Sequence, residues 1–328
     1  MASSRKTGTN ESVSTYGVGK SYTVLATWEA DTDNDLVATT ISPVLECYDN
    51  GSSFNDYVTL DGSTTSSSYF RIIRPAVGNK HNGTPNTGVR FANTTAAHVF
   101  YINESYSQVQ DLVAKSTFSS ASYFQVFYMH GVGSMTIGCI AYDSANSGTG
   151  ITAGFYADAN LAGPVDCLSH NNEGAGFSLY IVSAGQNAFA YNCTATNNGA
   201  PGGFRAGGTA GTTTLKNCLA SDNITDFVKV STVSPVVTYC ASKDATADDW
   251  AGAGNRINQT FTFVDSANDN FHLASTDAGA INYGTDLSAD GTFAFDDDID
   301  GQTRTAPWDI GADEYVTILP MMMQHHGG

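Results

Sequence analysis

A local pattern built around cysteine recurs along the middle of the chain and constrains its fold more than any other feature. Each copy reads Cys, any residue, Ala or Ser, any residue, then Asp or Asn. It is carried by Cys139, Cys167, Cys193, Cys218 and Cys240, which are separated by 28, 26, 25 and 22 residues. A repeat of this length is typical of a solenoid in which each repeat forms one coil.

A phenylalanine recurs in phase with the cysteines. Phe155, Phe177, Phe204 and Phe227 each fall between two cysteines of the series. Alternate side chains of a strand point to one face, so Cys and the small residue two positions later are expected to point inward together. The Asp or Asn that follows suits a turn, because these residues tolerate left-handed backbone angles. Stacked coils would then form a ladder of thiols and a ladder of rings.

We therefore predict an all-β fold, a right-handed parallel β-helix solenoid of about nine to ten coils. Leu25 and Trp28 suit a short helix that caps the first coil. The expected organisation is a flexible N-terminal arm over 1–20 and the β-helix with its N-terminal cap over 21–247. C-terminal coils and a closing cap are expected over 248–316, followed by an apolar tail over 317–328.

The charge and the cysteine spacing exclude several classes of function. Acidic residues outnumber basic ones 32 to 14, for a net charge of −18, and such a surface repels nucleic acid and anionic membranes. No segment has the roughly 18 consecutive apolar residues of a membrane span. The cysteines lack the close Cys/His pairs of a zinc site, so we expect them to pack inside the coils. Neighbouring coils aim them in the same direction, which is poor disulfide geometry.

The C-terminal region resembles the end segment of pectate-lyase-like right-handed parallel β-helix proteins. The matching runs are Asp269-Asn-Phe-His-Leu273, Asp298-Ile-Asp-Gly-Gln-Thr-Arg304 and Trp308-Asp-Ile-Gly-Ala-Asp-Glu-Tyr315. This resemblance implies the fold and leaves the activity open. The N-terminal runs Tyr22-Thr-Val-Leu-Ala-Thr-Trp-Glu29 and Glu46-Cys-Tyr48 are similar to β-helix proteins of phages and prophages. That second resemblance implies a virion surface component.

The enzymes of the pectate-lyase-like class cleave acidic polysaccharides with carboxylates and a basic residue. Here Arg205 and Lys229 lie close to two ladder phenylalanines about one coil apart, and Asp226 lies nearby. A groove formed by Arg205, Lys229 and Asp226 is the alternative catalytic site. The other interpretation is that these three side chains are scattered charges in contact with solvent.

The C-terminal acidic run offers weak metal ligands. Asp296, Asp298 and Asp300 are closely spaced carboxylates of the kind that bind Ca²⁺ on a turn, although the spacing of a standard calcium loop is missing. The other interpretation is a turn in which Asp300 or Asp309 pairs with Arg304. Structural roles are expected for the single histidines His170 and His272, and no other cofactor is expected.

The sequence favours a non-enzymatic structural protein that presents a rigid β-helix as a decoration, spike or fibre of a phage-like virion. Its expected partners are other virion proteins or further copies of itself, with a trimer as one option, and a cell-surface glycan. The start of the chain lacks a secretory signal, which agrees with this setting. The alternatives are an extracellular polysaccharide lyase or hydrolase and a secreted glycan-binding adhesin at the cell surface.

Overall fold

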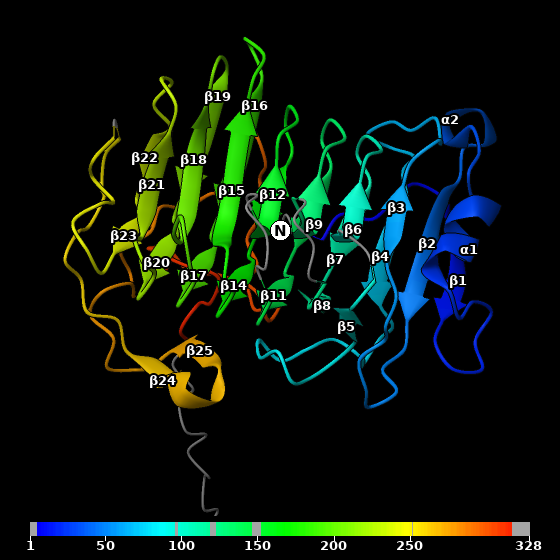
Figure 1. The fold of residues 1–328 in the computed structure, drawn as a ribbon, viewed down its shortest axis with the longest axis horizontal. Helices are drawn as coiled ribbons and strands as arrows, with labels where there is room; N and C mark the ends of the chain where they lie inside the picture. The colour runs from blue at the N-terminus through cyan, green and yellow to red at the C-terminus, as the bar shows by residue number, and fades with distance from the viewer. Residues whose placement is uncertain (1–4, 96–97, 119–122, 146–151, 251, 317–328) are drawn as a thin grey trace, which may run out of the picture.

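The chain winds into a β-helix whose coils stack along one axis (Figure 1). The computed structural model describes residues 5–95, 98–118, 123–145, 152–250 and 252–316; the predicted apolar tail over 317–328 lies outside them. About eight coils are formed. The strands nearest the viewer in Figure 1 run upward while successive coils advance to the left, so the winding is right-handed. The predicted all-β parallel β-helix is confirmed.

Three parallel sheets form the walls of the helix. The nine-stranded sheet contains β1 (Glu11–Tyr16), β2 (Ser42–Cys47), β4 (Ile72–Pro75), β7 (Gln108–Gln110), β10 (Met135–Ile137), β13 (Gly163–Val165), β16 (Asn187–Tyr191), β19 (Thr212–Lys216) and β22 (Val236–Thr238). The β5 sheet contains β5 (Arg90–Asn93), β8 (Val113–Ser116), β11 (Ile140–Tyr142), β14 (Leu168–His170), β17 (Thr194–Thr196), β20 (Leu219–Ser221) and β23 (Ala241–Ser242). The β3 sheet contains β3 (Val58–Leu60), β6 (His98–Ile102), β9 (Gln125–Met129), β12 (Ala153–Ala157), β15 (Ala175–Ile181), β18 (Phe204–Gly208) and β21 (Phe227–Val230).

The corner between the nine-stranded sheet and the β5 sheet is turned by a single residue. That residue precedes each repeat cysteine and has a positive φ: Gly138 (61°), Asp166 (51°), Asn192 (48°), Asn217 (53°) and Tyr239 (52°). Glycine, Asn and Asp reach this left-handed region at low cost. The turn aims the Cys that follows into the core and leaves its own side chain pointing outward.

The two predicted ladders are present and fill the interior. The repeat cysteines are buried and free, and the backbone N–H of Cys139 donates to Sγ of Cys167 at 3.4 Å. The phenylalanine ladder is longer than the sequence pattern predicted, because Phe100 and Phe127 extend it. Successive rings are stacked with centroids 4.8–5.4 Å apart, a separation typical of favourable aromatic pairs.

An asparagine ladder satisfies the polar groups of a second corner. Nδ2 of Asn172 donates to Oδ1 of Asn198 at 2.9 Å, and Nδ2 of Asn198 donates to Oδ1 of Asn223 at 3.0 Å. Each follows a residue with positive φ, as Asn171 (53°) and Asn197 (54°) show. The Asp/Asn positions of the repeat therefore turn the chain as predicted, and the next side chain links adjacent coils.

The N-terminal end of the core is covered as predicted. Helix α1 (Leu25–Asp31) buries Leu25 and Trp28 against the first coil, and α2 (Leu36–Thr39) follows it. None of the helices described is long and apolar enough to cross a membrane. The expected flexible arm over 1–20 differs from the structure, because β1 pairs along its whole length with β2 and the Arg5 guanidinium binds Asp111 and Asp297.

The C-terminal region does not close the solenoid in the way predicted. Trp250 packs on Phe227 at the end of the ring ladder, with centroids 6.1 Å apart, so the end is covered by residues close to Trp250. Residues 261–316, which we name the strap, instead run back along the outside of the coils (Figure 1, orange to red). The strap contains the antiparallel pair β24 (Phe263–Asp265) and β25 (Asn270–Leu273), with the 3₁₀ helix η1 (Ser266–Asn268) between them. Because the strap adds no coils, fewer form than predicted.

The strap covers apolar side chains that point out of the coils. Leu287, Phe295 and Trp308 pack on outward residues of the nine-stranded sheet. Phe271, Ile299 and Ala312 pack on Val113, Ile140, Tyr142 and Leu168 of the β5 sheet, and Ile310 packs on Leu219. These outward positions would otherwise expose hydrophobic surface, so the strap buries a second, external core.

Arg304 fixes the strap to the coils. Its buried guanidinium donates to Oδ1 of Asp166 at 2.9 Å and to Glu314 at 3.4 Å. It also donates to the carbonyl oxygens of Gly311 and Ala312. The sequence predicted Asp300 or Asp309 as the partner of Arg304, and this prediction was wrong because the strap folds over the Asp166 corner.

Replacing Arg304 by Met should destabilise the protein by about 3–5 kcal/mol, because Asp166 would be left buried without its cation. Urea unfolding at neutral pH measures this change. The matched control is Lys243→Met, which breaks an exposed pair with Asp222 and should cost less than about 1 kcal/mol. An equal effect of the two substitutions would contradict the role of Arg304.

Stability should also depend on the buried His170, which packs on Phe271 of the strap. Burial lowers the pKa of His170 to about 3, and neither ring nitrogen has a hydrogen-bond partner. The unfolded chain takes up a proton near pH 6.5 whereas the folded chain does not, so this group lowers stability as pH falls from about 6.5 toward 3.

The variant His170→Phe should therefore gain stability relative to the wild type as pH is lowered from 7 to 5. Urea unfolding at both values measures the difference. His130→Gln, at an exposed histidine, is the control and should not show this gain. A constant difference between His170→Phe and the wild type at both pH values would refute the prediction.

Candidate binding face

The outward side of the β3 sheet carries aromatic side chains on consecutive coils. The residue after each ladder phenylalanine points outward, because side chains alternate along a strand. Parallel register places Tyr101, Tyr128, Tyr156, Ser178 and Arg205 in one column. We name this surface the aromatic face; it also includes His98, Tyr123, His130, Asp158 and Tyr180.

The rings of the aromatic face contact one another. Tyr101 and Tyr128 are stacked with centroids 4.7 Å apart, and Tyr128 and Tyr156 meet edge to face at 5.1 Å. The His98 ring lies 5.2 Å from that of Tyr128. This packing holds the rings as a firm platform along the helix axis.

A polar network fixes the middle of the platform. The Tyr128 hydroxyl donates to Oδ2 of Asp158 at 2.7 Å. Oδ1 of the same carboxylate lies 2.7 Å from Nδ1 of His130. Asp158 is thus engaged at both oxygens, and the network orients the tyrosine and the histidine.

Arg205 is the cation of the aromatic face. Its Nη1 donates to the Ser178 hydroxyl at 2.9 Å, and the guanidinium lies over the Tyr180 ring with its carbon 5.6 Å from the centroid. No carboxylate among the described residues pairs with it. Arg205 is only 9% exposed, so its guanidinium is packed among these neighbours and presents a small part of its surface to a ligand.

A shallow hollow of about 180 Å³ opens beside the platform, lined by His98, Tyr123, Gln125, Tyr128 and Tyr156. Tyr123 is 64% exposed.

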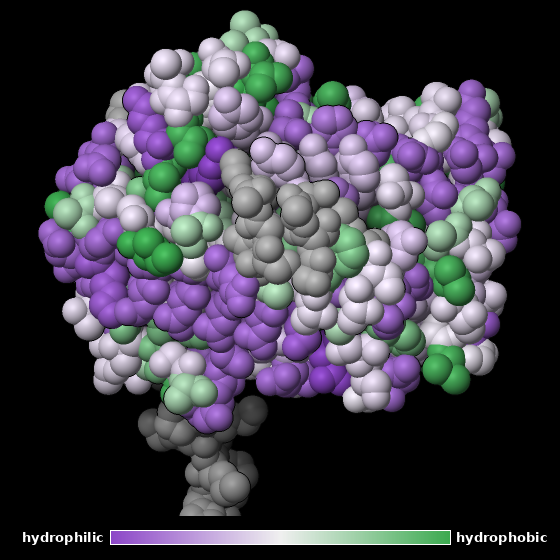
Figure 2. Space-filling view, viewed as in Figure 1, coloured by the Kyte–Doolittle hydropathy of each residue, from purple (hydrophilic) through white to green (hydrophobic). Residues whose placement is uncertain are grey.

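On the side of the molecule seen in Figure 2, hydrophilic residues gather over β14, β17 and β20, and the hydrophobic patches are small and separate. Outside the grey atoms, the surface seen from this side therefore shows no large apolar patch for a hydrophobic partner.

The ionisation of the aromatic face favours binding over proton abstraction. Burial and then the Asp158 charge raise the pKa of Tyr128, and the same causes raise the pKa of Tyr156 to about 12. Both hydroxyls therefore stay protonated at neutral pH and act as hydrogen-bond donors. Burial lowers the pKa of His98, which leaves that ring neutral. A tyrosinate base is disfavoured, and Asp158 has no second carboxylate beside it among the described residues of this network.

The structure does not bring the three predicted catalytic residues together. Arg205 pairs in register with Val228, and Lys229 pairs with Ala206, so Arg205 and Lys229 lie on opposite sides of their strands. The Lys229 ammonium donates to the Ser234 hydroxyl. Asp226 is buried in a turn, where it accepts from Asn223 and from the backbone of Lys243. Only Arg205 belongs to the aromatic face.

The predicted calcium ligands do not form one set either. Oδ1 of Asp298 accepts the backbone N–H groups of Asp300 and Gln302, and Oδ2 accepts that of Glu314, so this side chain shapes a turn. The Asp300 carboxylate contacts His272 instead. Among the described residues, His272, Asp300 and Asp313 form a group of potential metal ligands, which includes one of the predicted aspartates and leaves out Asp296 and Asp298.

The sequence analysis missed most of the aromatic face, although a signal was present. The dipeptide Phe-Tyr occurs at 100–101, 127–128 and 155–156, at the period of the repeat. An inward Phe followed by Tyr predicts a column of outward tyrosines beside the ring ladder. His130 and Asp158 follow the ends of β9 and β12, and no short pattern marks them.

Comparison with known proteins supports the fold alone. No family model matches the sequence, and no curated protein matches it. A solved structure described as pectate lyase Pel9A is similar, with a TM-score of 0.51 and 13% sequence identity. The likeness covers 95% of this chain and 98% of that one. The protein is therefore similar to a pectate lyase in architecture, and the low identity carries no activity across.

Proposed function

We propose that this protein binds a polysaccharide of low charge density along the aromatic face and does not cleave it. The observation that carries the proposal is the column of Tyr101, Tyr128 and Tyr156 on three consecutive coils. Arg205 lies two coils further along the same column, without an acidic partner among the described residues. The exposed Tyr123 ring suits the apolar face of a sugar ring, and the outward edges and hydroxyl groups of the tyrosine column suit its hydroxyl groups. The strand spacing of about 4.8 Å repeats these contacts along the axis.

The overall charge decides between neutral and acidic glycans. A net charge of −18 repels a dense polyanion such as polygalacturonate, and the one arginine of the face offsets little of this repulsion. A sparsely charged glycan is therefore favoured over the polyuronate that the name of the similar pectate lyase suggests.

A rigid glycan-binding rod fits the surface role that the sequence predicted. The place on a virion surface, the virion partners and the trimer stay predictions from the sequence. The lyase or hydrolase remains the competing proposal, supported by the architecture shared with a pectate lyase.

A glycan array that includes neutral polymers and polygalacturonate tests the proposed binding. The wild-type chain should retain neutral glycans, and Tyr128→Ala should weaken that retention by about tenfold or more, because it removes a central ring. Arg205→Gln should weaken it less. The matched control Lys229→Gln changes a cation close by on the opposite side of its strand and should have no effect.

Two results would overturn the proposal. One is equal retention by the wild type and Tyr128→Ala, or retention of no glycan by either. The other is cleavage of polygalacturonate, with or without added Ca²⁺, that disappears in Arg205→Gln, which would establish the lyase instead. Circular dichroism of each variant confirms that the β-helix is intact.

A further inference from the structure

We propose that His272, Asp300 and Asp313 form a zinc site that ties three segments of the strap together. One possible ligand atom from each side chain lies within 4.8 Å of the others. The three come from β25 and from two later turns of the strap. The site lies outside the aromatic face and is independent of the proposed glycan binding.

The hydrogen bonds of His272 prepare one nitrogen for a metal. Its Nδ1 faces Oδ1 of Asn270, an oxygen that only accepts, so Nδ1 carries the proton. Nε2 lies 2.9 Å from Oδ2 of Asp300 and donates its own proton to that carboxylate, so a metal would take the place of the Nε2 proton. A hydrogen-bond acceptor on the nitrogen that does not bind the metal is the usual arrangement for a metal-binding histidine.

One carboxylate oxygen at the site lacks a partner, and a second carboxylate is buried. Oδ1 of Asp300 is buried and accepts no hydrogen bond. Asp313 is only 7% exposed; its Oδ2 accepts the backbone N–H of Leu273 at 2.7 Å, and no described cation pairs with Asp313 other than the neighbouring His272. Buried carboxylate oxygens without donors are costly unless a cation neutralises them.

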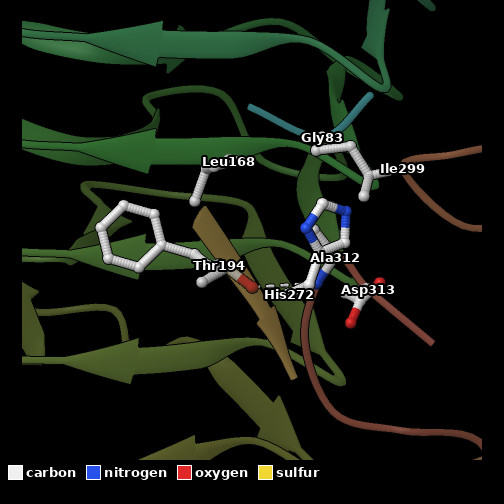
Figure 3. Close-up of a pocket in the computed structure, with 8 residues that line it drawn as sticks. Gly83, Leu168, Thr194, His272, Ile299, Ala312 and Asp313 are labelled. Carbon is white, nitrogen blue, oxygen red and sulfur yellow. Dashed lines mark hydrogen bonds between the residues drawn. The ribbon is translucent and has the colours of Figure 1, made fainter. Parts of the chain in front are cut away.

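A small cavity of about 10 Å³ adjoins the site (Figure 3). His272, Asp313 and Gly83 line one part of it, and Leu168, Phe271, Ile299 and Ala312 line another. Gly83 has a φ of +77°, and a Cβ added there would lie 2.3 Å from Nε2 of His272 and 3.0 Å from Oδ1 of Asp300. The absence of a side chain at Gly83 keeps the metal-facing atoms clear.

The donor set selects zinc over calcium. Calcium takes six to eight oxygen ligands, whereas zinc accepts imidazole nitrogen and carboxylate oxygen at about 2.0–2.2 Å in a four-coordinate site. One histidine and two aspartates would supply three ligands, and a water molecule would supply the fourth. Because the side chains of His272 and Asp300 are 19% and 21% exposed, solvent can reach the site.

Zinc titration of the full chain, stripped with a chelator, tests this site by calorimetry. The wild type should bind one Zn²⁺ with a dissociation constant in the micromolar range or below, and Ca²⁺ should bind at least tenfold more weakly. His272→Gln and Asp313→Asn should each weaken zinc binding by tenfold or more. Asn at 313 retains an acceptor for the Leu273 N–H, so this variant keeps the local hydrogen bond.

Three controls make the outcome decisive. His130→Gln removes the other exposed His–Asp pair and should leave zinc affinity unchanged. Alanine at both His325 and His326 removes the adjacent histidines near the end of the sequence, and the wild-type stoichiometry should persist in that background. Gly83→Ala keeps all three ligands and should still weaken binding.

The proposal is overturned if the folded wild type binds no zinc, or if His272→Gln and Asp313→Asn bind it as tightly as the wild type. The proposal is also overturned if the variant with alanine at both His325 and His326 no longer binds zinc. A rise in the melting temperature with Zn²⁺ in the wild type that is absent in Asp313→Asn would show that the metal fastens the folded strap.

Discussion

The main constraint on this molecule is the parallel, in-register stacking of short strands from successive coils. Once each backbone pairs with its equivalent one coil away, every sequence position becomes a column. A buried column must then be filled by side chains that tolerate identical neighbours on both sides. Thiols, phenylalanine rings and asparagine amides meet this condition in different ways. Small thiols fit beneath a tight corner, rings stack face to face, and amides both donate and accept.

The sequence predicted those parts of the fold for which the stacking leaves a short pattern of neighbouring residues. The Cys-x-Ala/Ser-x-Asp/Asn pattern places two inward side chains and one turn residue within five positions, and Leu25 and Trp28 predicted the helical cap. The strap could not be derived in this way, because its contacts join positions more than 100 residues apart, such as Arg304 and Asp166. A clue to it lay in the outward position of the repeat, where Ile140, Leu168 and Leu219 are apolar although a solvated sheet would favour polar residues there.

The candidate sites show that closeness in sequence to a ladder residue is insufficient to predict which side chains share a surface. Arg205 directly follows its phenylalanine and Lys229 lies two positions after its own, so alternation along the strand sends them to opposite sides. The residues that directly follow the ladder phenylalanines share an outward column with Arg205, and they include Tyr101, Tyr128, Tyr156 and Ser178. His272 and Asp313 belong to segments brought together by the path of the strap, and no spacing in the sequence indicates their proximity.

The strap also changes how the solenoid holds together. A simple stack of coils is quasi-one-dimensional, since each unit touches only its neighbours and either end can fray by itself. Here Arg5, near the start of the chain, binds Asp297 of the strap, 292 positions later in the sequence. The N-terminal segment and the strap are thereby joined on the outside of the coils. Detaching either of them removes a contact that holds the other. The coils should therefore unfold as a single cooperative body, unlike a stack that opens one coil at a time.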